Sequence, residues 1–174
     1  MADVSVLKIT DAAFAYGEQL IFQDITLETR PGEIFCLMGR NGCGKSTLLD
    51  CILGIQPLKK GAIKISDKSV DAYKPAELAK KMAYLPQSHE HSFPYKVLQV
   101  VLMGRTAYMS RFGAPTQEDK LIVKNLLDKI GITHLSDRPY TQLSGGELQM
   151  VMLARSLAQE APLILMDEPT AHLD

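Results

Sequence analysis

The sequence predicts an α/β fold with three parts: a parallel-sheet core, an N-terminal antiparallel β subdomain, and an α-helical subdomain inserted into the core. Three observations lead to this prediction. Apolar and polar residues alternate through the first sixty-five positions, which is typical of half-buried strands. IFCLM (34–38) and LILM (163–166) are continuous apolar runs, as expected of strands buried on both faces of a parallel sheet. Helical periodicity dominates from about residue 88 to residue 158.

We expect a single domain over residues 1–174, in which 1–87 hold the antiparallel sheet and the first part of the core. Residues 88–158 then form the helical subdomain, and 159–174 hold the last strand and the loop after it. In the antiparallel part, turn signals separate pairs of alternating apolar residues. These pairs are Val4 and Val6, Ile25 and Leu27, and Ile63 and Ile65.

The helices are predicted from their periodicity and from the residues at their ends. Thr116 and Asp119 have the spacing of a capping box, which predicts a helix that Gly131 ends. Gly54 predicts the end of a helix that begins at Lys45. The other predicted helices are 75–81, which precedes the strand MAYL, 95–109, and 144–159, which ends before Pro162.

Composition excludes several classes of protein. The 174 residues include 19 basic and 20 acidic side chains and have a net charge of -1, so no overall field attracts nucleic acid or anionic lipid. No apolar stretch is long enough to span a bilayer, and the N-terminus lacks the pattern of a signal peptide. The spacing of the three cysteines favours reduced thiols, so we expect a cytosolic protein.

GRNGCGKST (39–47) matches the phosphate-binding pattern G-x-x-x-x-G-K-[ST] and lies between an expected strand and an expected helix. Its glycines allow the backbone to turn successive N–H groups towards a triphosphate, and the helix that follows directs its positive end at the same oxygens. We expect Lys45 to reach the β- and γ-phosphates and Ser46 to bind Mg²⁺. The residues predicted to bind ATP here are Gly39, Asn41, Gly42, Cys43, Gly44, Lys45, Ser46 and Thr47.

Two carboxylates, Asp167 and Glu168, follow LILM directly. A structural Asp-Glu turn is the alternative interpretation. At the end of a strand beside a phosphate loop, however, Asp167 can hold Mg²⁺ and Glu168 can polarise the attacking water. These two motifs together predict a P-loop NTPase with a RecA-like parallel sheet, and they leave kinases, GTPases, helicases and ABC ATPases open.

LSGGE (143–147) decides among these classes, because it resembles the signature of the ABC ATPase family and lies in the family's order between the other two motifs. The Ser144 hydroxyl, the Gly145 and Gly146 N–H groups and a helix N-terminus form a second anion-binding surface. The resemblance implies a head-to-tail homodimer in which each ATP lies between the phosphate loop of one subunit and the signature of the other. It further implies that Tyr16 stacks on adenine and that Gln87, in YLPQ, contacts Mg²⁺ and assists hydrolysis. The alternatives are that Tyr16 is a packing aromatic and that Gln87 is a polar loop residue.

Within the family, FPYKVLQVVLMGR (93–105) and HLSDRPYTQLSGGE (134–147) are similar to ATP-binding subunits that import iron-siderophore, haem and cobalamin-type chelates. This resemblance implies a membrane permease bound through the helical subdomain, a periplasmic or extracellular substrate-binding protein, and a place at the cytoplasmic face of the membrane. The alternatives are other ABC transporters, such as metal-ion importers or exporters, and a soluble ABC ATPase that transports nothing. No nucleic-acid partner is expected.

Three further expectations concern loops and the end of the chain. His89-Glu90-His91 could be a metal site, although a solvated loop is the favoured interpretation. AHLD (171–174) resembles the family's D-loop, which crosses the dimer interface. The family also has a later strand, ending in a switch histidine, that lies in the centre of the sheet. We therefore expect the C-terminal part of the core to be missing from these 174 residues and the chain to have little ATPase activity.

Overall fold

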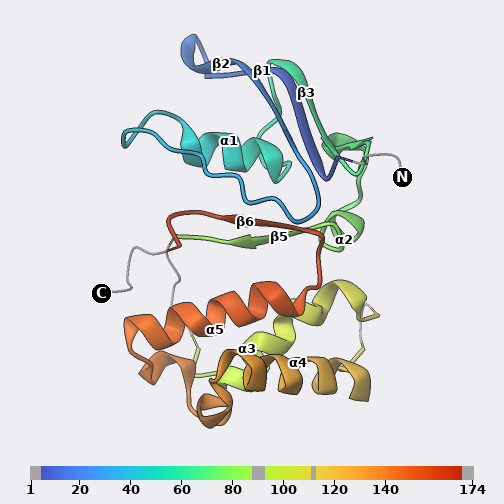
Figure 1. Ribbon diagram of the computed structural model, residues 1–174, viewed down its shortest axis with the longest axis vertical. Helices are drawn as coiled ribbons and strands as arrows, with labels where there is room; N and C mark the ends of the chain where they lie inside the picture. The colour runs from blue at the N-terminus through green and yellow to red at the C-terminus, as the bar shows by residue number, and fades with distance from the viewer. Residues whose placement is uncertain (1–4, 88–92, 111–112, 170–174) are drawn as a thin grey trace. The chain divides into compact units, whose positions relative to one another are not determined.

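A computed structural model of the chain describes residues 5–87, 93–110 and 113–169. It contains two compact units, residues 1–81 and 82–174. Figure 1 shows the elements of each unit, and each unit is described here by itself.

The first unit contains the antiparallel sheet that the alternating residues predict. Its strands are β1 (Leu7–Tyr16), β2 (Gln19–Thr29), β3 (Lys60–Ile65) and β4 (Lys68–Ser69), and they are ordered β2-β1-β3-β4. Every pair in this sheet is antiparallel. Ile9, Ile63 and Ile65 are fully buried beneath it, because alternate side chains of a strand point to the same face.

The helix α1 (Lys45–Ile52) follows the phosphate loop, as predicted, and buries Leu48, Cys51 and Ile52. It ends before Gly54, whose φ of 72° is the left-handed conformation that glycine adopts at little cost. A 3-10 turn, η1 (Val70–Ala72), and a short helix, α2 (Pro75–Leu78), complete the unit.

The prediction of a buried strand at IFCLM is wrong for this structure. Residues 34–38 have no strand assigned, and the exposed fractions of Ile34 and Met38 are 93% and 89%. An apolar run supplies side chains to bury, but a parallel strand also requires hydrogen-bonding partners along its edges. None of the strands in the described residues pairs with 34–38, so the run stays extended and exposed.

The second unit contains a parallel pair of strands covered by helices. The strands β5 (Met82–Leu85) and β6 (Leu163–Met166) pair with Leu85 opposite Met166, which confirms the parallel strand predicted at LILM. Only Leu165 of β6 is buried, at 8% exposed, and Met166 is 40% exposed, so burial on both faces is incomplete. The helix α5 (Gly145–Ala158) contacts β5, α3 (Val97–Leu102) and α4 (Gln117–Ile130) (Figure 1).

The ends of α4 and α5 agree with the capping residues in the sequence. Thr116 and Asp119 form a reciprocal capping box on α4, and Gly131 ends that helix at a φ of 82°. Ser144 and Glu147 form the corresponding box on α5. Two short 3-10 turns, η3 (Thr133–Leu135) and η4 (Tyr140–Gln142), connect the two helices.

The helix predicted over 95–109 is shorter than expected. It begins at Val97 and changes at Met103 into the 3-10 helix η2 (Met103–Tyr108). The change coincides with a close approach of Gly104 to α5, because a Cβ atom at Gly104 would lie 2.2 Å from the Arg155 carbonyl oxygen. None of the helices in the described residues is long and apolar enough to cross a membrane.

Candidate functional site

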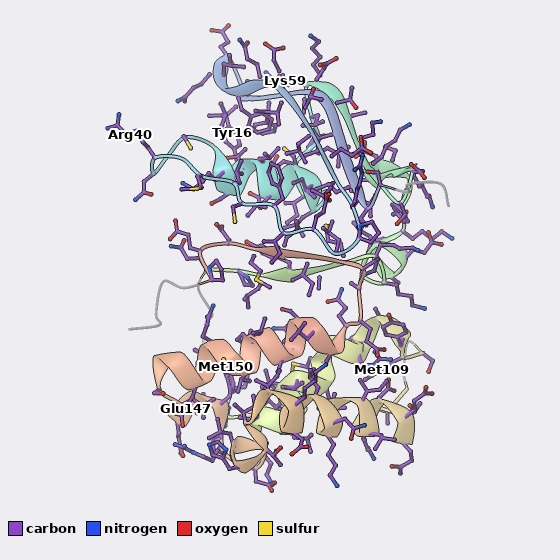
Figure 2. The ribbon with its side chains drawn as sticks, in the orientation of Figure 1. Tyr16, Arg40, Lys59, Met109, Glu147 and Met150 are labelled. Atoms are coloured by element: carbon purple, nitrogen blue, oxygen red, sulfur yellow. The ribbon has the colours of Figure 1, made fainter. Side chains whose placement is uncertain are left out.

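The phosphate loop in the first unit is closed by its own lysine. The Lys45 Nζ atom donates hydrogen bonds to the carbonyl oxygens of Gly39 (2.9 Å) and Arg40 (3.1 Å). Gly42 and Gly44 have φ angles of 79° and 97°, which L side chains rarely adopt and which turn the backbone sharply before α1. In Figure 2, Arg40 points away from the outer end of this loop.

The residues at the start of α1 suit a phosphate group. The N-cap residue is Gly44, which has no side chain to cap the helix, and the first turn contains no carboxylate. The first N–H groups and the positive end of the helix dipole therefore face the loop without a competing anion from that turn. Ser46 is exposed and Thr47 is half-buried, one and two positions after the lysine.

Tyr16, at the end of β1, is 50% exposed and belongs to an aromatic cluster that reaches the phosphate loop. Its ring packs edge-on against Phe14 at 4.8 Å, and Phe14 stacks on Phe22 at 6.0 Å. Phe22 and Ile21 in turn lie against Gly44, where an added Cβ atom would meet Ile21 at 2.8 Å. The half-exposed ring is thus supported by packing that continues to the start of α1 (Figure 2).

Gln87 and Glu168 lie together in the second unit, each just after one strand of the parallel pair. The Gln87 side-chain amide donates a hydrogen bond to the Glu168 carboxylate. Parallel strands end at the same edge of a sheet, and the pairing of Leu85 with Met166 aligns the two residues. Glu168, Gln87 and Lys45 are the residues predicted to be catalytic; the structure brings the first two together, and Lys45 belongs to the first unit.

Asp167 is buried, with 8% of its surface exposed, and its backbone N–H donates to the Leu85 carbonyl oxygen at 3.0 Å. The predicted Mg²⁺ ligands divide between the units: Ser46 belongs to the first, and Gln87 and Asp167 belong to the second. Hydroxyl, amide and carboxylate oxygens are suitable ligands for Mg²⁺. His89-Glu90-His91 and AHLD lie outside the described residues, and within the described residues no three His, Cys, Asp or Glu side chains are grouped so as to hold a metal ion.

The signature residues begin α5 in a fixed arrangement. The Ser144 N–H donates to Glu147 Oε2 at 2.8 Å, and the Glu147 N–H donates to Ser144 Oγ at 3.3 Å. Gly145 and Gly146 are the first two residues of the helix, and Glu147 lies at its amino end in Figure 2. Hydrogen bonds from the Ser144 backbone and side chain lower the pKa of Glu147, so its carboxylate is ionised at neutral pH.

Sequence reasoning missed two residues that support this part of the chain. Arg138 Nη1 lies 3.3 Å from Glu147 Oε1, and its Nη2 donates to the Gln142 carbonyl oxygen at 3.0 Å. Gln149 is buried on α5, and its amide donates to the Pro169 carbonyl oxygen at 2.8 Å. A glutamine among Leu148, Met150 and Val151 was the available signal, because a buried amide requires a hydrogen-bonding partner.

Comparisons with known proteins agree with this arrangement. A family model described as "ABC transporter" matches residues 22–171. The chain is 38% identical over 97% of its length to the molybdate import ATP-binding protein MolC of Haemophilus influenzae. It is 42% identical over 92% of its length to the hemin import ATP-binding protein HmuV of Thermobifida fusca. Among solved structures, cbiO1 from Clostridium perfringens, part of the ABC transporter complex cbiONQ, superimposes with a TM-score of 0.85 at 30% identity, covering 98% of this chain and 68% of that one.

The chain spans 62% of the length of the molybdate import protein and 56% of the length of the hemin import protein, which is less than two thirds of either.

Proposed function

This chain belongs to the ABC transporter family, and from that premise we propose that it is the ATP-binding and ATP-hydrolysing subunit of an ABC importer. In this proposal the energy of ATP drives uptake of a metal chelate, of the iron-siderophore, haem or cobalamin type, through a membrane permease. The observation that carries the proposal is that one chain has two anion-binding helix starts, GRNGCGKST before α1 and LSGGE before α5.

The phosphate loop and Tyr16 bind the nucleotide in this proposal. Lys45 leaves the Gly39 and Arg40 carbonyl oxygens and pairs with phosphate oxygens, which a cation binds more strongly than neutral carbonyls. The N–H groups at the start of α1 bind the same phosphates, and the Tyr16 ring stacks on adenine. Ser46, Asp167 and Gln87 are the residues that hold Mg²⁺, which neutralises phosphate charge when it is bound.

Glu168 prepares the water for hydrolysis. Its carboxylate accepts a hydrogen bond from the water that attacks the γ-phosphate and so orients a lone pair of that water. The Gln87 amide already donates a hydrogen bond to this carboxylate, so the orientation of the Glu168 side chain is set before the water binds. The Gln87 side-chain nitrogen makes this bond, so its Oε1 atom would be the one that holds Mg²⁺.

The signature residues act on a second copy of the chain. The Ser144 hydroxyl and the N–H groups of Gly145 and Gly146 bind the γ-phosphate held by the partner's phosphate loop. ATP thereby closes a head-to-tail homodimer. The helical subdomain predicted over residues 88–158 receives the permease, which places the dimer at the cytoplasmic face of the membrane, and a substrate-binding protein delivers the cargo from outside.

A hemin importer among the relatives supports a chelate as cargo. A molybdate importer at similar identity keeps the second candidate, an ATPase of another metal importer, in consideration. Affinity purification of the natural protein separates these importers from a soluble ABC ATPase. Co-purification of a multi-spanning permease supports the importer, whereas a ribosomal particle in its place would refute it.

Two substitutions test the chemistry, using the natural protein that contains this sequence. Lys45→Ala should weaken ATP binding by on the order of tenfold or more, because a charge-assisted contact to phosphate is lost. Lys8→Ala removes an exposed lysine that pairs with Glu28 at 3.6 Å; it is the matched control and should bind ATP as wild type does. Unchanged ATP affinity in the Lys45 variant would refute its phosphate contact.

Glu168→Gln should abolish phosphate release and preserve ATP binding, since the amide keeps the shape of the side chain and loses the basic oxygen. Phosphate release is measured with and without Mg²⁺, which also separates an ATPase from a protein that only binds nucleotide. Normal turnover in this variant would remove Glu168 from the water-activating role.

A further inference from the structure

Three polar side chains on one side of α5 and at its C-cap contact backbone carbonyl oxygens elsewhere in the second unit. Gln149, Ser156 and Gln159 are seven and then three positions apart, so they lie on the same side of the helix. Gln159 donates to the Met82 carbonyl oxygen at 2.7 Å, and Ser156 Oγ lies 3.3 Å from the Tyr84 carbonyl oxygen. Both of these contacts are to β5, away from the candidate catalytic residues.

Gln149 differs from the other two in its target. Its amide donates to the Pro169 carbonyl oxygen at 2.8 Å, and Pro169 directly follows Glu168. Gln149 is 7% exposed, so solvent does not offer its amide an easy alternative partner. It lies on the first turns of α5, where Glu147 and Met150 are labelled in Figure 2, and only three positions after the signature glycine Gly146.

The backbone at Glu168 requires support from its surroundings. Its φ angle is 46°, in the left-handed region, which costs a residue with a Cβ atom on the order of 1 kcal/mol and persists where neighbouring contacts impose it. On one side, the Asp167 N–H is bonded to the Leu85 carbonyl oxygen. On the other side, Gln149 donates to the Pro169 carbonyl oxygen. Together they hold the backbone just before Asp167 and just after Pro169, on either side of Glu168.

We propose that Gln149 is a positioning residue for Glu168: its hydrogen bond to the Pro169 carbonyl oxygen fixes the backbone that follows Glu168, and so links the signature helix to the hydrolytic carboxylate of the same chain. This inference rests on the proposed function. The start of α5 acts on the nucleotide of a second copy, and Glu168 acts on the nucleotide of its own chain. Gln149 therefore couples the two nucleotide sites of a dimer through one buried amide.

The test measures kcat and KM for MgATP in the natural protein that contains this sequence. Gln149→Met keeps the length and volume of the side chain and removes the donor. We expect kcat to fall on the order of tenfold or more, with KM for ATP unchanged within about twofold, because a displaced catalytic group slows the chemical step without weakening nucleotide binding. Gln149→Asn retains an amide that is one methylene too short to reach Pro169, and should be as slow.

Gln159→Met is the matched control, because it removes a partly buried amide hydrogen bond at the C-cap of the same helix, at a site remote from Glu168. The two Met variants should unfold at similar temperatures, and Gln159→Met should keep the wild-type kcat. Wild-type kcat in Gln149→Met, or an equal loss of kcat in Gln159→Met, would overturn the positioning role. If the wild-type protein itself released no phosphate from ATP, the proposed function would fail first, and the positioning role with it.

Discussion

The buried ion pair between Arg105 and Asp119 should contribute measurably to the stability of the second unit. Arg105 Nε donates to Asp119 Oδ1 at 2.9 Å, and the two side chains are only 6% and 7% exposed. Asp119 also accepts hydrogen bonds from the Thr116 backbone (2.9 Å) and hydroxyl (2.7 Å) at the start of α4. Arg105 donates in addition to Glu160 at 2.6 Å, so the group joins η2, α4 and the residues after α5.

Asp119→Asn keeps the shape of the side chain and removes its charge. The hydrogen bond from Arg105, followed by those from Thr116, lowers the pKa of Asp119 from 3.8 to about 2. At about 1.36 kcal/mol for each pKa unit, the ionised form stabilises the folded state by about 2 kcal/mol. We expect Asp119→Asn to lower the free energy of unfolding by about this amount at neutral pH.

The assay is urea unfolding followed by circular dichroism, with Asp137→Asn as the control. Asp137 pairs with Lys96 at 2.7 Å, but its side chain is 86% exposed, so its loss should cost less than about 1 kcal/mol. Because the folded pKa of Asp119 lies below its unfolded value, its contribution is complete above about pH 4 and is lost as the pH falls from about 4 towards 2. The difference between wild type and Asp119→Asn should therefore shrink over that range. Equal midpoints for the two variants, or a difference that does not change with acidification, would refute the reasoning.

The remaining predictions concern single residues with clear surroundings. Burial, with a smaller effect of Asp50, raises the pKa of the Cys51 thiol to about 11. Alkylation at about pH 8, followed by mass spectrometry, should therefore modify the exposed Cys36 and Cys43 and spare Cys51. Rapid labelling of Cys51 would contradict its burial. Gly61→Ala should destabilise the first unit by roughly 2 kcal/mol or more, because its φ is 86° and the added Cβ atom would lie 2.4 Å from the Thr10 carbonyl oxygen. Gly17 has a φ of 57° but open space around it, so Gly17→Ala should lower the free energy of unfolding by only about 1 kcal/mol, measured by thermal unfolding. Equal losses of stability at the two glycines would show that the contact with Thr10 adds no cost.

The local features of the fold could be predicted from the sequence because their causes are local. Thr116 with Asp119, and Ser144 with Glu147, each specify a helix start within four residues, and both capping boxes are present in the structure. Gly131 likewise ends α4 for a reason contained in its own backbone. The motif GRNGCGKST predicts a loop followed by a helix for the same reason, and α1 begins at Lys45.

Features that depend on distant partners could not be predicted with the same success. Residues 34–38 have the composition of a buried strand, but whether they form one depends on backbone partners elsewhere in the chain. Arg105 carries no local sign that it will meet Asp119 and Glu160. The contact between Gln87 and Glu168 was predictable in outline, since both follow expected strands, but it required the pairing of β5 with β6.

The central claim is that the phosphate loop of one chain and the signature of a second copy hold the same triphosphate. Its most direct test is a crystal structure of the natural protein with a nonhydrolysable ATP analogue and Mg²⁺. We predict phosphate oxygens within hydrogen-bonding distance of Lys45 Nζ and of the N–H groups at the start of α1, and Ser144 and Gly146 of a second copy against the γ-phosphate. A triphosphate bound away from residues 39–47, or one that no second copy contacts through its signature residues, would contradict the claim.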